Sequence, residues 1–205
     1  MTPAPAPAPD RLAFPFVGGR PCLDFAATLG KRHTDAFERL TDPGALGRWI
    51  GEAGLRTDRP QAVHVTGAEL VSARELRESL YRVLTAAMDG RAPAPHDLVR
   101  VNEAAAHPDL APQLDFADGG GRAGLRLQGG PVRHDVRAAL ATVARDAVQL
   151  VGGPLLARVK ECENPECSLL FLDDSQARRR RWCSMDRCGN LAKIAGYRSR
   201  ARGGS

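Results

Sequence analysis

The sequence has few aromatic residues and no long hydrophobic run. Phe, Trp and Tyr make up 5% of the 205 residues, and Ala, Leu and Val supply most of the 43% that is hydrophobic. This composition favours helices and argues against an all-β sandwich. No stretch approaches 18 consecutive apolar residues, and the first residues alternate Ala and Pro without the basic and apolar regions of a secretory signal. We therefore expect a cytoplasmic protein without a membrane partner.

Patterns typical of catalytic sites are also missing. The histidines at positions 33, 64, 96, 107 and 134 are scattered, and no Ser/His/Asp or paired-carboxylate pattern surrounds them. The glycines at 119–121 lack the strand, glycine, helix order and the lysine of a phosphate-binding loop. We expect that the chain is not an enzyme and has no catalytic residues.

Composition and the positions of glycine and proline divide the chain into three parts. Residues 1–13 form a Pro/Ala tail that has nothing with which to build a core, so we predict it to be disordered. Residues 14–153 show helical periodicity, interrupted by a predicted β-hairpin of residues 113–116 and 124–128 around a glycine-rich bend. Gly152-Gly153-Pro154 ends the last of these helices and marks the predicted boundary with a second domain, 154–205.

Two helices of the first domain carry clear start signals. Asp42-Pro43 is typical of an N-cap followed by proline at the first helical position. Thr66 and Glu69 fit a capping box, in which each side chain binds a backbone N–H group of the other residue. The expected fold class is a mainly α N-terminal domain with a small β-hairpin.

The cysteines provide the strongest signal in the chain. Four of them form two pairs, Cys162-x4-Cys167 and Cys183-x4-Cys188, separated by fifteen residues, and the fifth, Cys22, stands alone. Each pair can fold back on itself, and the intervening loop can bring the pairs together around a tetrahedral ion. No histidine follows position 134, so the ligand set would be four thiolates, a closed site typical of structural zinc.

Two disulfides, a redox pair and an iron site are the competing interpretations of these cysteines. The pairs are spaced by four residues rather than two, and neither an export signal nor thioredoxin-like strands accompany them. We therefore predict one structural Zn2+, bound by Cys162, Cys167, Cys183 and Cys188.

The residues around the cysteines predict a treble-clef-like finger. Leu169–Leu172 has the pattern of a strand, 173–175 that of a turn, and Arg179–Trp182 that of a returning strand. After Gly189 the pattern is helical to about Arg200. The finger is thus expected to be a hairpin followed by a helix that carries the last ligand in its first turn.

Positive charge is concentrated in the same region. Residues 175–205 contain nine Lys or Arg and one Asp, so the formal charge of +5 belongs to this end and the rest of the chain is net negative. A compact basic patch neutralises phosphates, although arginines on a solvated strand edge are the simpler alternative. In a strand, alternation would place at most half of the run 178–181 on one face.

We predict that one set of side chains contacts nucleic acid. These residues are Arg178, Arg179, Arg180, Arg181, Lys193, Tyr197, Arg198 and Arg200. Leu191, Ile194 and Ala195 share the opposite face of the expected helix, which we expect to pack on the hairpin.

The motifs resemble two known families. The Cys162 pair, the run Arg178–Met185 and Cys188-Gly189-Asn190 with the residues downstream are similar to the CGNR zinc finger, a bacterial module. Gly18–Phe25 (GGRPCLDF) resembles the start of the ABATE domain that precedes this finger in many bacterial proteins. The resemblance implies a transcription regulator with a C-terminal DNA-binding finger and an N-terminal domain for a ligand or stress signal.

Two positions depart from these family patterns. The arginine that follows the asparagine in the finger's name is Leu191 here, which removes one phosphate or structural contact. Ala27 stands where an asparagine is common before the threonine of the N-terminal motif.

The combined hypothesis is a zinc-dependent DNA-binding transcription regulator, located in the cytoplasm with the nucleoid. Its N-terminal domain would bind a small-molecule effector, form a homodimer, or do both. An RNA-binding protein is one alternative, since arginines and stacking aromatics serve RNA equally well. A small-molecule-binding or enzymatic N-terminal domain with a docking finger is the other.

Overall fold

The computed structural model describes residues 12–55, 64–108, 110, 112–117, 124–129 and 136–194. Five helices, three two-stranded antiparallel sheets and two short helical turns make up these segments. The helices are α1 (Pro21–Ala26), α2 (Pro43–Glu52), α3 (Gly67–Met88), α4 (Pro95–Ala106) and α5 (Val136–Val151). The strands are β1 (Leu29–Gly30), β2 (Phe37–Glu38), β3 (Pro112–Ala117), β4 (Gly124–Gly129), β5 (Val159–Glu161) and β6 (Leu170–Leu172). The predicted disordered tail lies almost entirely outside the described residues.

The predicted helix starts are confirmed. The Asp42 carboxylate accepts a hydrogen bond from Ala45 N at 2.9 Å and caps α2, with Pro43 at its first position. Thr66 and Glu69 form the capping box at the start of α3. These caps satisfy backbone N–H groups that a helix cannot pair internally, which is why short sequence signals fix the helix boundaries.

One hydrophobic core lies between the helices. Trp49 of α2 is fully buried and packs at 4.8 Å, centroid to centroid, on Phe25 of α1. α3, α4 and α5 pack on one another and contribute the apolar stripes that their sequence periodicity predicts. Cys22 is also completely enclosed in this core, and burial raises its pKa, so its thiol is a packing group.

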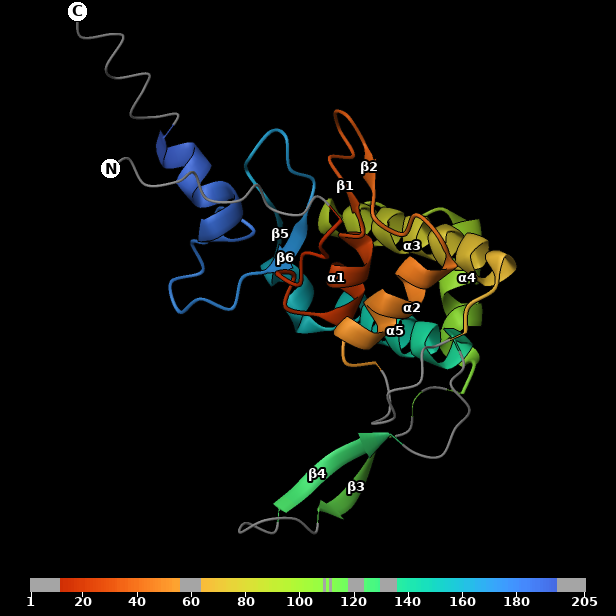
Figure 1. Ribbon diagram of the computed structural model, residues 1–205. Coiled ribbons are helices and arrows are strands. Elements are labelled where there is room, and N and C mark those ends of the chain that lie inside the picture. The colour runs from red at the N-terminus through yellow and green to blue at the C-terminus, as the bar shows by residue number, and fades with distance from the viewer. Residues whose placement is uncertain are drawn as a thin grey trace, which may run out of the picture.

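The predicted β-hairpin is confirmed in β3 and β4. The two strands pair in antiparallel register, with Leu114 opposite Leu127, and the glycine-rich bend lies outside the described residues. In Figure 1 this hairpin stands apart from the helices.

The second hairpin uses a different strand pair from the one predicted. β6 matches the expected strand, but it pairs with β5, which precedes the first cysteine. The prediction of a returning strand at Arg179–Trp182 is wrong, because the backbone there forms a loop whose Arg178 has a positive φ of 50°. In place of strand pairing, a backbone hydrogen bond from Glu163 N to Arg181 O, 3.0 Å long, joins the loop to the turn that carries the first cysteine pair.

The final helix begins earlier than predicted. Ser184 caps it by accepting a hydrogen bond from Arg187 N, and a π-helical turn, η2 (Met185–Gly189), leads into helical residues 190–194. Cys188 therefore lies in the first turn, as expected. The prediction that the apolar face packs on the hairpin is wrong, since Leu191 and Ile194 are 59% and 48% exposed.

β6 joins the finger to the helices. Side chains alternate along a strand, so Leu170 faces the helical core while Leu169 and Phe171 face the cysteines. The hairpin β5–β6 lies beside α1 (Figure 1), and Leu172 N donates to Gly18 O at 2.8 Å. A 3-10 turn, η1 (Pro154–Arg158), follows α5 directly, and Val159 belongs to the helical core. The finger and the helices therefore share buried surface.

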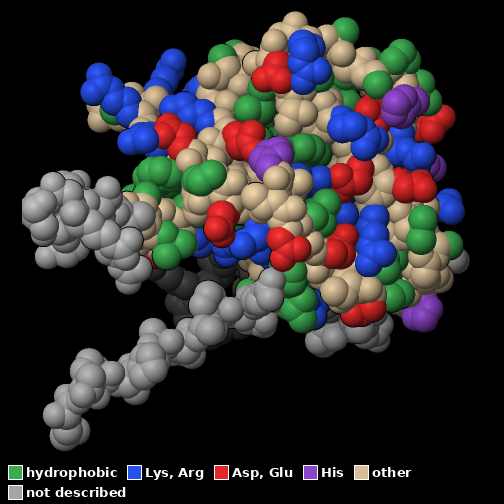
Figure 2. Space-filling view, turned by 90° about the horizontal axis from the view of Figure 1, so that it is seen from above, with side chains coloured by type: hydrophobic (Ala, Val, Ile, Leu, Met, Phe, Trp, Pro, Cys, Tyr) green, Lys and Arg blue, Asp and Glu red, His purple; other side chains and the backbone are tan. Residues whose placement is uncertain are grey.

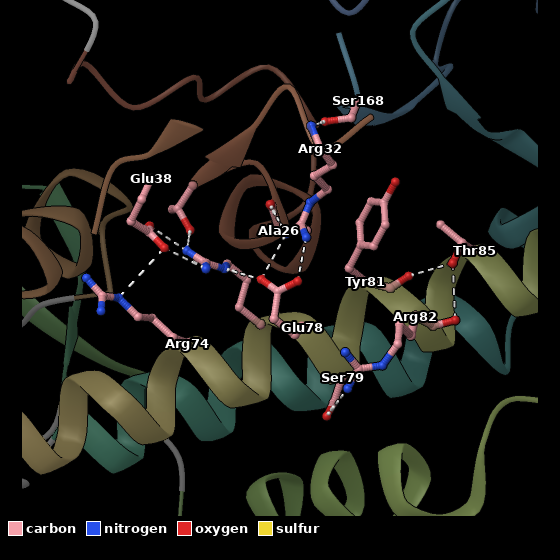
Figure 3. A network of polar contacts seen from close by, with 12 residues as sticks. Ala26, Arg32, Glu38, Arg74, Glu78, Ser79, Tyr81, Arg82, Thr85 and Ser168 are labelled. Carbon is pink, nitrogen blue, oxygen red and sulfur yellow. Dashed lines mark hydrogen bonds and ion pairs between the residues drawn. The ribbon is translucent and has the colours of Figure 1, made fainter. Parts of the chain in front are cut away.

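A polar network reinforces this contact (Figure 3). Arg32, in the β1–β2 loop, binds both Glu78 carboxylate oxygens of α3 and lies 4.0 Å above the Tyr81 ring. Its backbone N–H donates to Ser168 Oγ, next to a predicted metal ligand, at 2.9 Å. Arg77, only 3% exposed, binds both carboxylate oxygens of Glu38 at 2.7 Å. The loop is thus fixed to α3 on one side and to the finger on the other.

Among the described residues, no helix combines the length and apolar character that crossing a membrane requires.

Candidate metal centre and nucleic-acid interface

The two cysteine pairs come together at one point. Cys162 follows β5 and Cys167 precedes β6, so the first pair forms the turn of this hairpin, while Cys183 and Cys188 flank the start of the final helix. The four sulfur atoms lie within 4.8 Å of one another. Three of the residues are buried, which excludes water from most of the cluster.

The spacing of the sulfurs fits one zinc ion. Zn–S bonds of about 2.3 Å at tetrahedral angles separate two ligand sulfurs by about 3.8 Å. The Cys167–Cys183 and Cys183–Cys188 sulfur distances are 3.9 and 3.6 Å. All of the cysteines are unbridged, so four sulfur donors are available, the set that zinc favours at closed structural sites.

N–H groups point at the sulfurs. Asn164 Nδ2 donates to Cys188 Sγ at 3.3 Å, and Cys183 N donates to Cys162 Sγ at 3.4 Å. Donors of this kind offset the formal charge of −2 that four thiolates and a dication carry.

The loop 173–182, which we call the arginine loop, is organised by an ion pair between the buried Asp173 and the half-buried Lys160. Asp173 has no exposed surface, and its Oδ2 binds Lys160 Nζ at 2.6 Å and Arg180 N at 3.0 Å. The Lys160 ammonium beside it holds the pKa of this carboxyl well below its usual range. Lys160 Nζ also donates to Arg178 O at 2.7 Å, so one pair of side chains fixes several points of the loop.

The four arginines of the run have different surroundings. The Arg180 guanidinium lies 4.5 Å above the Phe171 ring and donates to the carbonyls of Trp182, Cys183 and Val17. Arg181 binds Glu163 at 2.6 Å and lies 5.1 Å from the centre of the Trp182 ring. Arg178 and Arg179 are exposed and have no ion-pair partner in the described part of the chain.

The remaining predicted contacts are only partly described. Lys193 is exposed on the final helix. Tyr197, Arg198 and Arg200 lie outside the described residues. Sequence reasoning missed the pairing of Lys160 with Asp173, for which the signal in the sequence is an acid directly after a buried strand.

Two family models match the chain. One, described as "ABATE: Putative stress-induced transcription regulator", covers residues 19–154. The chain belongs to the ABATE family. The second, the CGNR zinc finger, covers residues 158–201, so the four cysteines lie in a zinc finger and are positioned to bind one metal ion. Comparison with curated proteins gives no match.

The start of the ABATE domain contacts the finger. Asp24 Oδ1 accepts a hydrogen bond from Gly18 N at 2.8 Å, and a Cβ at Gly18 would lie 2.7 Å from Leu23 Cβ. Gly18 O and Val17 O in turn accept bonds from Leu172 N and Arg180 Nη2. Val17 and Gly18, where the motif begins, therefore hold both strand β6 and Arg180 of the finger.

The two departures from the family patterns have structural consequences in the ABATE protein. Ala27 is 3% exposed and packs in the hydrophobic cluster around the cysteines, where its methyl group meets apolar atoms. The neighbouring Thr28 is fully buried and accepts a bond from Arg77 Nη1 at 3.2 Å. Leu191 is exposed, so an arginine at that position would extend into solvent.

The zinc assignment predicts the metal content of cysteine variants. Freshly purified, reduced protein should contain one zinc per chain by native mass spectrometry, and Cys183→Ala should lose it and unfold the finger, because three thiolates cannot close the site. Cys22→Ala, which removes a buried thiol remote from the cluster, should retain the metal. Zinc-free wild type, or unchanged zinc in Cys183→Ala, would contradict the four-thiolate site.

Asp24 predicts a specific dependence of stability on pH. Burial raises its pKa from 3.8 to about 6, against the opposing hydrogen bonds from Gly18 and Val17, and nearby Asp146 adds to the rise. The folded state then binds more protons than the unfolded state between pH 4 and 6, so Asp24 lowers the free energy of unfolding as pH rises through this window.

Asp24→Asn keeps the acceptor for Gly18 N but removes the charge. Its free energy of unfolding in urea should therefore rise relative to wild type between pH 4 and 7. Asp24→Ala, which leaves the Gly18 amide without its partner, should be less stable than Asp24→Asn at every pH. Parallel pH profiles for wild type and Asp24→Asn would refute the role of this carboxyl.

Proposed function

We propose that the chain is a DNA-binding transcription regulator whose finger contacts the phosphate backbone through the arginine loop. Arg178 and Arg179 carry this proposal, because both are exposed and neither has an ion-pair partner among the residues that the structure describes. The protein would act at the nucleoid in the cytoplasm and would catalyse no reaction.

The distribution of ion pairs supports the proposal. In the helical part, several arginines form ion pairs with acids. Arg82 binds the buried Asp97 at 2.6 Å, and Arg100 binds Glu75 at 2.8 Å. In Figure 2 positive and negative side chains alternate over this body, whereas the lobe projecting at the upper left carries mainly positive ones. Unpaired cations attract phosphates, because no carboxylate must first be displaced.

The geometry of the loop also supports phosphate contact. Its backbone is fixed by Asp173 and Lys160, so the two free guanidinium groups start from a defined position and less conformational entropy is lost on binding. Arginine suits this role since its planar fork binds phosphate oxygens in pairs.

The proposal predicts how salt affects affinity. Each lost phosphate contact removes about 0.9 from the slope of log K against log salt, so Arg178→Ala/Arg179→Ala should flatten this slope for duplex DNA by about 2. Affinity for all sequences should fall alike, as backbone contacts carry no sequence information. Fluorescence anisotropy over a series of salt concentrations measures this slope.

Arg91→Ala serves as the matched control. Arg91 is exposed between α3 and α4, far along the chain from the finger, and its guanidinium binds Asp89, so its removal should leave the slope unchanged. An unchanged slope in the double variant would show that the arginines form a solvated edge. Tighter binding of single-stranded RNA than of duplex DNA at every salt concentration would favour the RNA-binding alternative.

We further propose that the N-terminal ABATE domain dimerises, binds an effector, or does both. A single finger presents one short helix and one loop, which is little surface for the roughly 10⁻⁸ M affinity of specific regulators. Dimers overcome this limit by reading two half-sites, and the family description refers to stress-induced regulation.

Dimerisation predicts the mass of the whole protein in solution. Because the finger and the helices share a core, the full chain rather than a fragment should be examined. Sedimentation equilibrium should give twice the chain mass, and DNA titrations should saturate at two chains per site. A monomer that binds DNA with one chain per site would exclude the dimer and leave effector binding as the domain's role.

A further inference from the structure

The finger carries a hollow of about 270 Å³ beside the metal site. Arg179, Arg180, Arg181, Trp182 and Met185 line it. Small-molecule pockets typically span about 300–1,000 Å³, so this one suits a single planar group rather than a larger ligand. Its lining combines cationic guanidinium groups with an indole ring and a thioether, so it offers both positive charge and an aromatic plane.

We propose that this hollow receives one unpaired nucleobase of the bound DNA. This inference rests on the proposed DNA binding and adds to it a site for a base, where the arginine loop alone would contact only phosphates. Bases out of the helical stack are commonly held by aromatic rings and arginine planes, and this stacking tolerates any sequence.

The stacking surface is already formed. The Arg181 guanidinium lies over the Trp182 ring at 5.1 Å, and the Glu163 carboxylate holds it there through a 2.6 Å bond to Nε. Two planar groups are thereby fixed at the hollow before any ligand arrives. A base that stacks on them would not need to order flexible side chains first.

The other wall of the hollow depends on a glycine. A Cβ at Gly189 would lie 2.5 Å from Met185 Sδ and 3.3 Å from Trp182 Cδ1. Because Gly189 has no Cβ, the side chains of Met185 and Trp182 can lie against its backbone. Met185 remains 46% exposed at the rim, where a polarisable sulfur can contact a base edge.

The cations are arranged for a nucleotide rather than for an uncharged aromatic molecule. Arg180 is held inward by the carbonyls of Trp182 and Cys183 and forms part of the lining. Arg179 is exposed beside it and has no ion-pair partner among the described residues, so it can bind the phosphate that adjoins a base in the hollow. The site thus offers a plane for the base and a charge for its phosphate.

The test compares three DNA hairpins with the zinc-loaded full-length protein. One has a fully paired stem, one carries a single bulged thymidine, and one carries an abasic residue in place of that thymidine. The abasic bulge has the same backbone charge and similar bending freedom, so only the base differs. Affinity is measured by anisotropy, and tryptophan emission is recorded in the same titration.

The thymidine bulge should bind roughly 5- to 150-fold more tightly than the abasic bulge, the range that stacking of one base supplies. It should also change the emission of Trp182, while Trp49, which is completely buried, gives a constant background. Arg181→Lys keeps the charge but removes the planar guanidinium, and should reduce the preference for the thymidine bulge over the abasic bulge. Arg91→Lys should change neither quantity.

The possible failures separate the two proposals. Equal affinity for thymidine and abasic bulges, with no change in emission, would overturn the base site and leave backbone binding intact. If none of the three hairpins binds, the proposed DNA-binding function is wrong and the base site falls with it. A preference that Arg181→Lys retains in full would also overturn the inference, since the stacking plane would then be elsewhere.

Discussion

The placement of the finger depends on β6, a strand of three residues whose two faces enter two different hydrophobic clusters. Leu170 packs among the helices, and Phe171 packs beside the cysteines. A one-residue shift in register would reverse both contacts, so the pairing with β5 and the bond from Leu172 to Gly18 fix the whole finger against α1. The arginine loop leaves β6 at Asp173, so its position follows from this strand.

Local patterns allowed much of the fold to be predicted. Helix caps act within four residues, and cysteine spacing restricts which sulfurs can meet, so α2, α3 and the four-sulfur cluster could be identified without knowledge of any distant contact. Strand β6 could be predicted in the same way, because its apolar run is bounded by turn residues. These features depend on short stretches of chain, which a sequence displays directly.

Long-range contacts account for what could not be predicted. β5 has little strand character of its own and is defined by pairing with β6. Four consecutive arginines look equivalent in the sequence, but only the structure shows that Phe171 and three carbonyl oxygens bind Arg180. The role of Asp24 likewise depends on residues 17–18 and their contact with the finger.

The arginine loop illustrates how a buried anion can determine where positive charge is displayed. The loop leaves β6 at Asp173 and ends at Cys183, so one end is held by the Asp173–Lys160 ion pair and the other by the cysteine cluster. Lys160 neutralises Asp173 and binds the carbonyl of Arg178, which keeps that residue in its left-handed conformation. Since β5 supplies Lys160 and β6 leads into Asp173, the same hairpin that carries the first cysteine pair also anchors the loop. The cysteine pair, the strand pairing and the placement of Arg178 and Arg179 therefore all depend on one hairpin. We expect loss of the metal to unfold the finger and to leave these two arginines without a fixed position.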